Sequence, residues 1–242
     1  MQKNIAIKAD DGHLIYGVLN SRKKSNKLII FVHGLTGNKN EHIFFNGSRF
    51  FTNQNFDTFR FDLYTWKDKG RKLSDTTVEI HSKDTNNVVD FFKNKYKKIF
   101  LVGHSYGALT ILKSDLSNVS GLILWDSASP IKISWITDKN YNKDLDAYVV
   151  NWGNEFVIGK AMFEERKNFP KHEEFMKKIN VPIKIICAGK TSLLRDGKLF
   201  FKYAKKPKEF SIIKDAGHTF SEEGKEEELF EETLKFLNKY SK

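Results

Sequence analysis

The sequence contains a single cysteine, Cys187, among its 242 residues. One cysteine excludes an internal disulfide framework and a zinc site built from several cysteines. No stretch of about 18 uncharged apolar residues occurs, so we expect no transmembrane helix. The first twelve residues, MQKNIAIKADDG, lack an apolar core and include two aspartates, which is unlike a secretory signal. We therefore expect a cytoplasmic protein.

Arginine, the side chain best suited to binding phosphate through paired hydrogen bonds, is also scarce. Only six of the 41 basic residues are arginine, and the lysines are spread along the chain. The formal net charge is nevertheless +11, a balance that accompanies nucleic-acid or anionic-membrane binding in other sequences. Because the charge is dispersed and mostly lysine, we expect no nucleic-acid partner.

The chain has enough apolar material to form a large core. Hydrophobic residues make up 40% and charged residues 29% of the sequence, as in soluble globular proteins. Internal repeats and low-complexity linkers are lacking. At about 150 residues per domain, we expect residues 1–242 to form a single domain that carries an insertion.

Strand-like and helix-like segments alternate along most of the chain. The runs 4–8 and 14–19 flank Asp10-Asp11-Gly12, which is a hairpin signal. Residues 28–32 (LIIFV) and 121–125 (GLILW) are continuous apolar runs, as expected for strands buried on both faces. Further strands are expected at 56–61, 99–102, 183–187 and 209–213, and helices at 41–52, 76–94, 106–116, 172–179, 197–204 and 221–239.

This alternation predicts an α/β fold, a mostly parallel sheet with helices on both faces and an antiparallel hairpin at its edge. The alternation stops between about residues 131 and 170, which we interpret as a cap insertion above the sheet. Six basic and six acidic residues balance its charge, so we expect the cap to favour a neutral acyl or aryl group. Its aromatic residues include Trp135, Tyr141, Tyr148, Trp152 and Phe156.

The strongest functional signal is Gly103-His104-Ser105-Tyr106-Gly107, which lies between an expected strand and an expected helix. A sharp turn from strand to helix forces Ser105 into a strained backbone conformation, and the flanking glycines allow close packing around it. The serine hydroxyl is then exposed at the carboxyl end of the sheet and the N-terminus of a helix. This context is typical of a nucleophilic serine.

A second glycine-containing loop, His33-Gly34-Leu35-Thr36-Gly37, follows the strand at 28–32. Such a loop can direct backbone N–H groups at a developing oxyanion. The expected donors are the amides of Leu35 and Tyr106. His33 lies on the wrong strand to act as a base, and we expect it to order the loop.

The third signal is the segment DAGHTF, between the last strand and the last helix. Of the seven histidines, only His218 lies in a loop that can reach back to Ser105 as a general base. We expect His42, His81 and His172 on helix surfaces. No two histidines have a convincing metal-binding spacing, so we expect no metal, and no signal for a cofactor is found.

In the order HGLTG, GHSYG and AGHTF, these motifs make the chain resemble the α/β-hydrolase family over nearly its whole length. It looks most similar to small bacterial feruloyl (cinnamoyl) esterases, monoacylglycerol lipases and acyl thioesterases. The resemblance implies an eight-stranded sheet whose second strand is antiparallel, with a cap between strands six and seven. It also implies a serine hydrolase that cleaves small-molecule carboxylic esters or thioesters through an acyl-enzyme on Ser105, with His218 as the base.

The resemblance leaves the acidic member of the triad open. Family members commonly carry this aspartate after strand seven, where this sequence has Gly189-Lys190-Thr191-Ser192. The next carboxylate, Asp196, resembles the N-cap of the following helix. Asp126 follows strand 121–125 in an Asp-x-Ala-x-Pro setting similar to that of some lipases with this fold. Either strand end can place a carboxylate beside the His218 ring, so Asp126 is the first candidate and Asp196 the alternative.

Two other functions remain open from the sequence alone. The missing aspartate after strand seven is compatible with a non-catalytic ligand-binding protein on the same fold. A peptidase or amidase is also compatible with the fold, although no residue marks an amine-binding acid. The natural substrate and the oligomeric state are not determined by the sequence.

Overall fold

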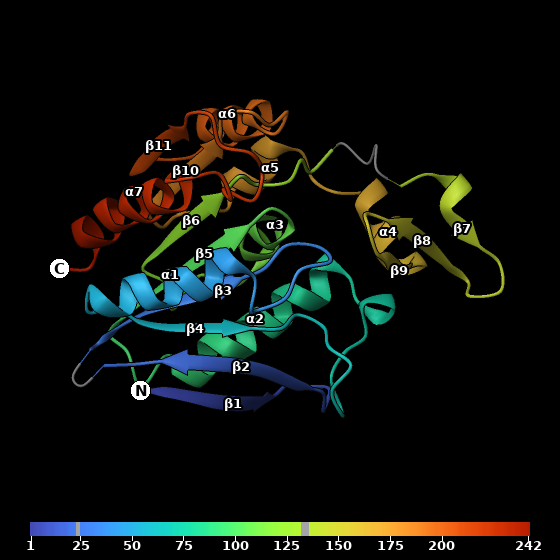
Figure 1. The fold of residues 1–242 in the computed structure, drawn as a ribbon, viewed down its shortest axis with the longest axis horizontal. Helices are drawn as coiled ribbons and strands as arrows, with labels where there is room; N and C mark the ends of the chain where they lie inside the picture. Colours follow the sequence, from blue (N-terminus) through green and yellow to red (C-terminus); the bar gives the residue numbers. More distant parts are fainter. Residues whose placement is uncertain (23–24, 132–135) are drawn as a thin grey trace.

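The computed structural model describes residues 1–22, 25–131 and 136–242. Its body is an eight-stranded sheet between two layers of helices (Figure 1). The strands lie side by side in the order β1-β2-β4-β3-β5-β6-β10-β11. Their bounds are β1 (Gln2–Lys8), β2 (Leu14–Asn20), β3 (Lys27–Val32), β4 (Asp57–Phe61), β5 (Lys98–His104), β6 (Gly121–Trp125), β10 (Ile183–Ala188) and β11 (Lys208–Ile213).

Strand β2 pairs antiparallel with β1 and β4, and the other neighbours in this sheet pair parallel. The order and directions confirm the predicted α/β-hydrolase fold. The helices are α1 (His42–Asn53), α2 (Val78–Phe92), α3 (Tyr106–Lys113), α4 (Lys160–Lys167), α5 (His172–Lys177), α6 (Leu194–Tyr203) and α7 (Lys225–Tyr240), with 3-10 turns η1 (Leu73–Asp75) and η2 (Asp138–Asn140).

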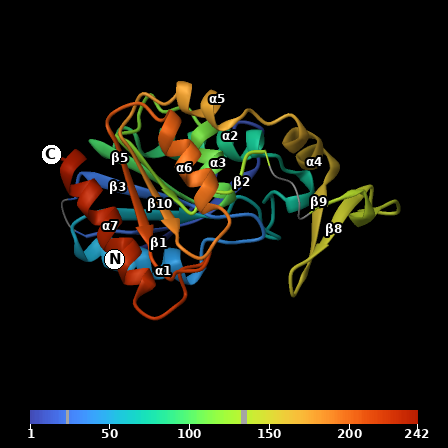
Figure 2. The ribbon, with the colours of Figure 1, turned by 90° about the horizontal axis from the view of Figure 1, so that it is seen from above.

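Both faces of the sheet are covered by helices, as the continuous apolar strands predict. Helices α1 and α7 cover one face, and α2, α3, α5 and α6 cover the other (Figures 1 and 2). On β3, Ile29 and Phe31 face the α1 and α7 side, whereas Leu28, Ile30 and Val32 face the opposite cluster. Each of these side chains is at most 1% exposed, so β3 is a central strand.

The parallel strands end at a common edge. Val32 of β3 lies opposite Gly103 of β5, and His104 lies opposite Trp125 of β6. Trp125 also faces Ile186 of β10. The loops that follow these strands therefore meet at one edge of the sheet, where every candidate site motif lies.

The segment between β6 and β10 forms a second, antiparallel sheet from β7 (Tyr141–Asn142), β8 (Ala147–Asn151) and β9 (Glu155–Gly159), followed by α4. Figures 1 and 2 place it to one side of the main sheet. Glu165 of α4 links the two parts, because its carboxylate accepts hydrogen bonds from the Val78 and Glu79 N–H groups at 2.6 and 2.9 Å. Of the residues expected in the cap, Lys132 and Trp135 lie outside the described ranges.

Two helix starts differ from the expectation. Helix α7 begins at Lys225 rather than near residue 221, because Gly224 adopts a left-handed conformation with φ 74°. Helix α6 begins at Leu194 rather than 197, because Leu193 already has helical dihedral angles. Asp196 therefore lies in the first turn of α6, and its expected position as the N-cap is wrong. None of the helices in the described ranges has the length and apolarity needed to cross a membrane.

Candidate active site

Ser105 occupies a strained turn between β5 and α3. Its φ and ψ are 54° and −116°, a conformation that a non-glycine residue adopts only when its surroundings impose it. The Ser105 N–H donates to Trp125 O at 3.0 Å, and Ser105 O accepts from the Ala128 N–H at 3.0 Å. A Cβ on Gly107 would lie 2.1 Å from Val32 O. Only glycine fits there, because β3 passes directly behind the turn.

The loop after β3 lies against Ser105. A Cβ built on Gly34 would be 3.2 Å from Ser105 Cβ. Among the described residues, the Leu35 N–H donates no hydrogen bond. The Tyr106 N–H is the first of α3 and has no acceptor within that helix. The two N–H groups expected to bind an oxyanion are therefore both available beside the serine.

His218 contacts Asp126. The His218 Nδ1 donates to Asp126 Oδ2 at 2.7 Å. The Asp126 side chain is fully buried, and its Oδ1 accepts from the Ala188 N–H and from the Thr191 hydroxyl, each at 3.1 Å. These contacts hold the proton of the neutral imidazole on Nδ1 and leave Nε2 as an acceptor.

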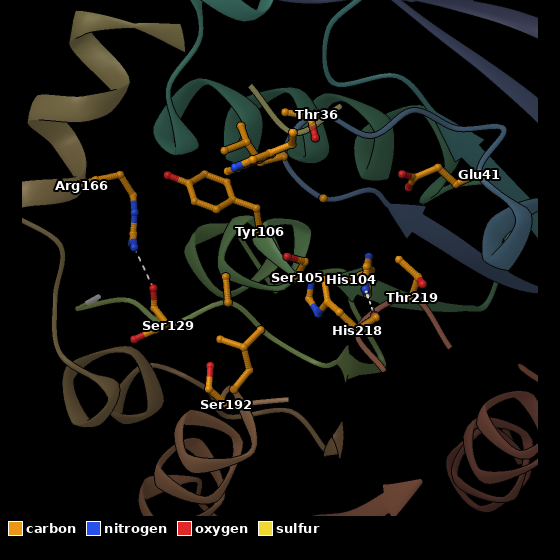
Figure 3. Close-up of a pocket in the computed structure, with 15 residues that line it drawn as sticks. Thr36, Glu41, His104, Ser105, Tyr106, Ser129, Arg166, Ser192, His218 and Thr219 are labelled. Carbon is orange, nitrogen blue, oxygen red and sulfur yellow. Dashed lines mark hydrogen bonds between the residues drawn. The ribbon is translucent and has the colours of Figure 1, made fainter. Parts of the chain in front are cut away.

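His104 holds the backbone beneath His218. Its Nε2 donates to His218 O at 2.8 Å, and the two rings lie 4.7 Å apart (Figure 3). Burial lowers the pKa of His104 to about 3, because desolvation disfavours the charged ring. His104 is therefore a neutral donor that fixes the position of the His218 loop.

Ser105 and His218 line one cavity of about 490 Å³ together with Leu35 and Tyr106. Figure 3 shows the two side chains next to each other, approaching the cavity from different segments. Within the described ranges no hydrogen bond joins the Ser105 hydroxyl to His218.

The structure separates the alternative acid, Asp196, from His218. Asp196 Oδ1 instead accepts a hydrogen bond from His172 Nε2 at 2.8 Å, between α5 and α6. Burial raises the pKa of Asp196, but hydrogen bonds from His172 and Ser129 outweigh it and hold that pKa below its ordinary value. Of the two candidate carboxylates, the structure brings only Asp126 to the His218 ring.

Two histidines expected on helix surfaces are buried. His172 is 3% exposed and His81 is 1% exposed, so both expectations are wrong. His81 shares the apolar face of α2 with Val78 and Val88, which is the face that packs on the sheet. The helical period was the signal that could have placed it inside.

His33 orders the loop that carries Leu35, which agrees with the expectation. Its Nδ1 donates to Gly34 O at 2.8 Å, and its Nε2 accepts from the Leu63 N–H at 2.9 Å. Burial lowers the pKa of His33 to about 4. The ring is therefore neutral and links two loops of the site.

Two charged side chains of the cavity were missed by the sequence analysis, Glu41 and Arg166. Glu41 is the residue before α1, and burial raises its pKa to about 7. Arg166 belongs to α4 in the cap and is 3% exposed. Neither lies in a recognisable motif, and only the folded chain brings them to the same cavity as Ser105.

Comparison with known proteins identifies the family to which this sequence belongs. The sequence model described as the alpha/beta hydrolase family matches residues 29–231. No curated protein sequence matches the chain.

Solved structures share the fold over nearly the whole chain. Est1E from Butyrivibrio proteoclasticus, with ferulic acid bound, is 19% identical, with 98% of each chain covered and a TM-score of 0.84. The esterase domain of a Rhodothermus marinus protein is 19% identical, with 99% of each chain covered and a TM-score of 0.77. The Pyrococcus furiosus esterase Pf2001 is also 19% identical, with 99% of this chain and 93% of that chain covered and a TM-score of 0.73.

Proposed function

The chain belongs to the alpha/beta hydrolase family, and from this premise we propose that it is a serine hydrolase of small-molecule carboxylic esters or thioesters. One observation carries the proposal. The strained Ser105 turn and the His218–Asp126 pair, with an Nδ1–Oδ2 distance of 2.7 Å, meet at the same cavity. A nucleophile, a base and an acid that orients the base are the three groups that acyl transfer needs.

The reaction begins when the Ser105 hydroxyl attacks the carbonyl carbon and His218 Nε2 takes its proton. The N–H groups of Leu35 and Tyr106 donate to the oxyanion of the tetrahedral intermediate. Asp126 stabilises the imidazolium that His218 becomes. His218 then protonates the leaving alkoxide or thiolate, which leaves an acyl group on Ser105. Water, activated by His218, hydrolyses this acyl-enzyme.

The position of Asp126 favours catalysis over ligand binding alone. The non-catalytic alternative was motivated by the missing aspartate after strand seven. Asp126 comes from the neighbouring strand β6, and Thr191 of the loop after β10 donates a hydrogen bond to it. The carboxylate needed beside His218 is thus available from a different strand, and the motive for the alternative is weakened.

The test combines labelling with turnover. We expect a fluorophosphonate probe to label Ser105, and Ser105→Ala to fold while losing roughly 10³-fold or more of kcat on a 4-nitrophenyl ester. Ser114→Ala, at the opposite end of α3 from Ser105, is the control, because its hydroxyl only donates to Thr110 O. Turnover retained by Ser105→Ala would exclude the mechanism. A native protein with neither labelling nor turnover would instead be a binding protein.

The acyl group is tested with a substrate panel. Because Est1E was solved with ferulic acid bound, feruloyl esters belong in the panel beside aliphatic esters, thioesters and anilides. We expect ester and thioester cleavage to exceed anilide cleavage. A preference for anilides would support the amidase alternative.

A further inference from the structure

One end of the cavity contains a buried cation without a counterion. Arg166 lines the cavity and is 3% exposed. Among the described residues, no carboxylate forms an ion pair with it. The sequence outside those ranges, residues 23–24 and 132–135, includes no aspartate or glutamate. The adjacent Glu165 binds the N-terminus of α2 and Lys113.

Neutral groups hold the guanidinium in position. Its Nη1 and Nη2 donate to Pro130 O and Ser129 O at 3.0 and 2.7 Å. The ring centroids of Phe169 and Tyr106 lie 4.5 and 5.3 Å from its central carbon. These contacts fix the orientation of Arg166 but supply no negative charge.

Two buried donor groups at this end of the cavity lack an acceptor, one of them on Arg166 itself. Within the described ranges, neither Arg166 Nε nor the Tyr106 hydroxyl has a hydrogen-bond partner. Figure 3 shows the Tyr106 hydroxyl end directed toward the Arg166 side of the cavity. Burial raises the pKa of Tyr106 well above its ordinary value, so the phenol keeps its proton. Buried unpaired donors are costly, and an anion bound at this end of the cavity would supply acceptors for them.

The opposite end of the cavity carries the other sign of charge. Glu41 lies there with a pKa that burial raises to about 7. Figure 3 shows Glu41 and Arg166 on opposite sides of Ser105. An anionic group on the substrate is therefore attracted to the Arg166 end and repelled from the Glu41 end once Glu41 ionises. The cavity has a polarity that orients a substrate charged at one end.

We propose that Arg166 and the Tyr106 hydroxyl form a carboxylate-binding subsite, and that the substrates are esters or thioesters bearing a free carboxylate, such as half-esters of dicarboxylic acids. The assignment rests on the proposed hydrolase function. It replaces the neutral group expected from the balanced charges of the cap, because those charges are not evenly placed. Arg166 is buried at the cavity, whereas the acidic residue beside it is engaged elsewhere. Arginine is suited to this role, because its guanidinium stays charged when buried.

Binding is measured first, without chemistry. Ser105→Ala protein is titrated calorimetrically with monomethyl adipate, which carries one carboxylate, and with neutral dimethyl adipate. We expect the monoester to bind at least tenfold more tightly. Adding Arg166→Met should abolish this difference, whereas adding Lys167→Met should preserve it. Lys167 is the matched control, since it lies next to Arg166 on α4 but is solvent-exposed and paired with Glu164.

Turnover gives an independent measure. The ratio of kcat/KM for the 4-nitrophenyl half-ester of adipic acid to kcat/KM for its methyl-capped diester is compared among variants. We expect Arg166→Met to lower this ratio at least tenfold, Arg166→Lys to restore part of it, and Tyr106→Phe to lower it several-fold. Tyr106→Phe removes only a hydroxyl without a partner, so it remains informative if Arg166→Met fails to fold.

The outcomes separate the two proposals. Equal affinity for the two adipates, or a preference that survives Arg166→Met, would overturn the subsite. Tighter binding of the corresponding phosphonate would overturn its assignment to carboxylates. Ester turnover without a half-ester preference would leave the hydrolase proposal standing alone. A half-ester preference in binding without turnover by the native protein would leave only a carboxylate-binding protein.

Discussion

At the scale of single residues, the site depends on unusual backbone positions. Ser105 has φ 54° and Asp126 has φ 40°, and both immediately follow a strand of the main sheet. The glycine pattern around Ser105 predicts its position, because few contexts other than a sharp strand-to-helix turn require glycines at both flanks. Nothing comparable marks Asp126. Its Asp-x-Ala-x-Pro setting favours Asp126 over Asp196, but only the three-dimensional pairing with His218 separates the two.

The first prediction concerns this pair of aspartates. In Asp126→Asn the side-chain oxygen can still accept from Ala188 and Thr191, but the amide group faces His218 Nδ1 and favours the wrong tautomer. We expect kcat on a 4-nitrophenyl ester to fall roughly 10³- to 10⁴-fold while the protein stays folded. Asp196→Asn, which alters the contact with His172, is the comparison and should change kcat less than about tenfold. The reverse order would make Asp196 the acid.

The second prediction concerns the pH dependence of stability at Glu41. Burial raises its folded-state pKa from 4.5 to about 7, so the folded state holds the proton more tightly than the unfolded state. Ionising Glu41 therefore costs stability, and the cost grows as pH rises from about 4.5 to above 7. We expect Glu41→Gln to raise Tm by roughly 6 to 12 °C at pH 8, from about 3 kcal/mol, and to change it little at pH 4.5.

Thermal unfolding followed by circular dichroism across this pH range measures the effect. Glu173→Gln, on the exposed part of α5, serves as the control and should shift Tm equally at both ends of the range. A Glu41→Gln effect independent of pH would contradict a raised pKa.

At the scale of elements, the pattern of the sequence predicts the strands of the main sheet and the presence of a cap insertion, but not the strands within that insertion. The central strands β3, β5, β6 and β10 are mostly apolar runs, because they are buried on both faces, whereas the edge strands β1 and β11 are more polar and partly exposed. The cap strands β8 and β9 are five residues long and only partly buried. The sequence does contain a hairpin signal here, because Gly153 lies between the mostly apolar runs AYVVN and EFVIG. The mixed composition of the insertion concealed it. In the structure Gly153 has φ 88°.

The third prediction tests how α4 is attached to the body. The Glu165 carboxylate accepts two N–H groups at the start of α2 and pairs with Lys113 at 3.2 Å. A negative group at a helix N-terminus contributes about 1 kcal/mol. We expect Glu165→Gln to lower Tm by roughly 2 to 4 °C. Glu164→Gln, its exposed neighbour paired with Lys167, should lower it by less than 1 °C or so.

At the scale of the whole molecule, the cavity is assembled from segments that are distant in sequence. Gly34, Ser105, Ser129 and His218 follow four different strands, and Arg166 comes from the cap. The motifs predict the contributions of Gly34, Ser105 and His218, because a shared sheet edge brings strand ends together. The contribution of the cap could not be predicted, since it depends on how α4 docks against α2 and on which side chains of α4 face inward.

The fourth prediction follows from the size of this shared cavity. Its volume of about 490 Å³ is that of a pocket for one small ligand, and Arg166 and Trp152 of the cap line it. An acyl chain that fills this space gains apolar burial with each methylene, about 0.8 kcal/mol at most, until it reaches the cap residues. A longer chain must displace the cap or remain in water. We therefore expect kcat/KM for neutral 4-nitrophenyl esters to rise from acetyl to an intermediate length and to fall at least tenfold by dodecanoyl. Initial rates below the micellar concentration of each ester measure the profile, and a flat profile would show that the cap does not limit the acyl group.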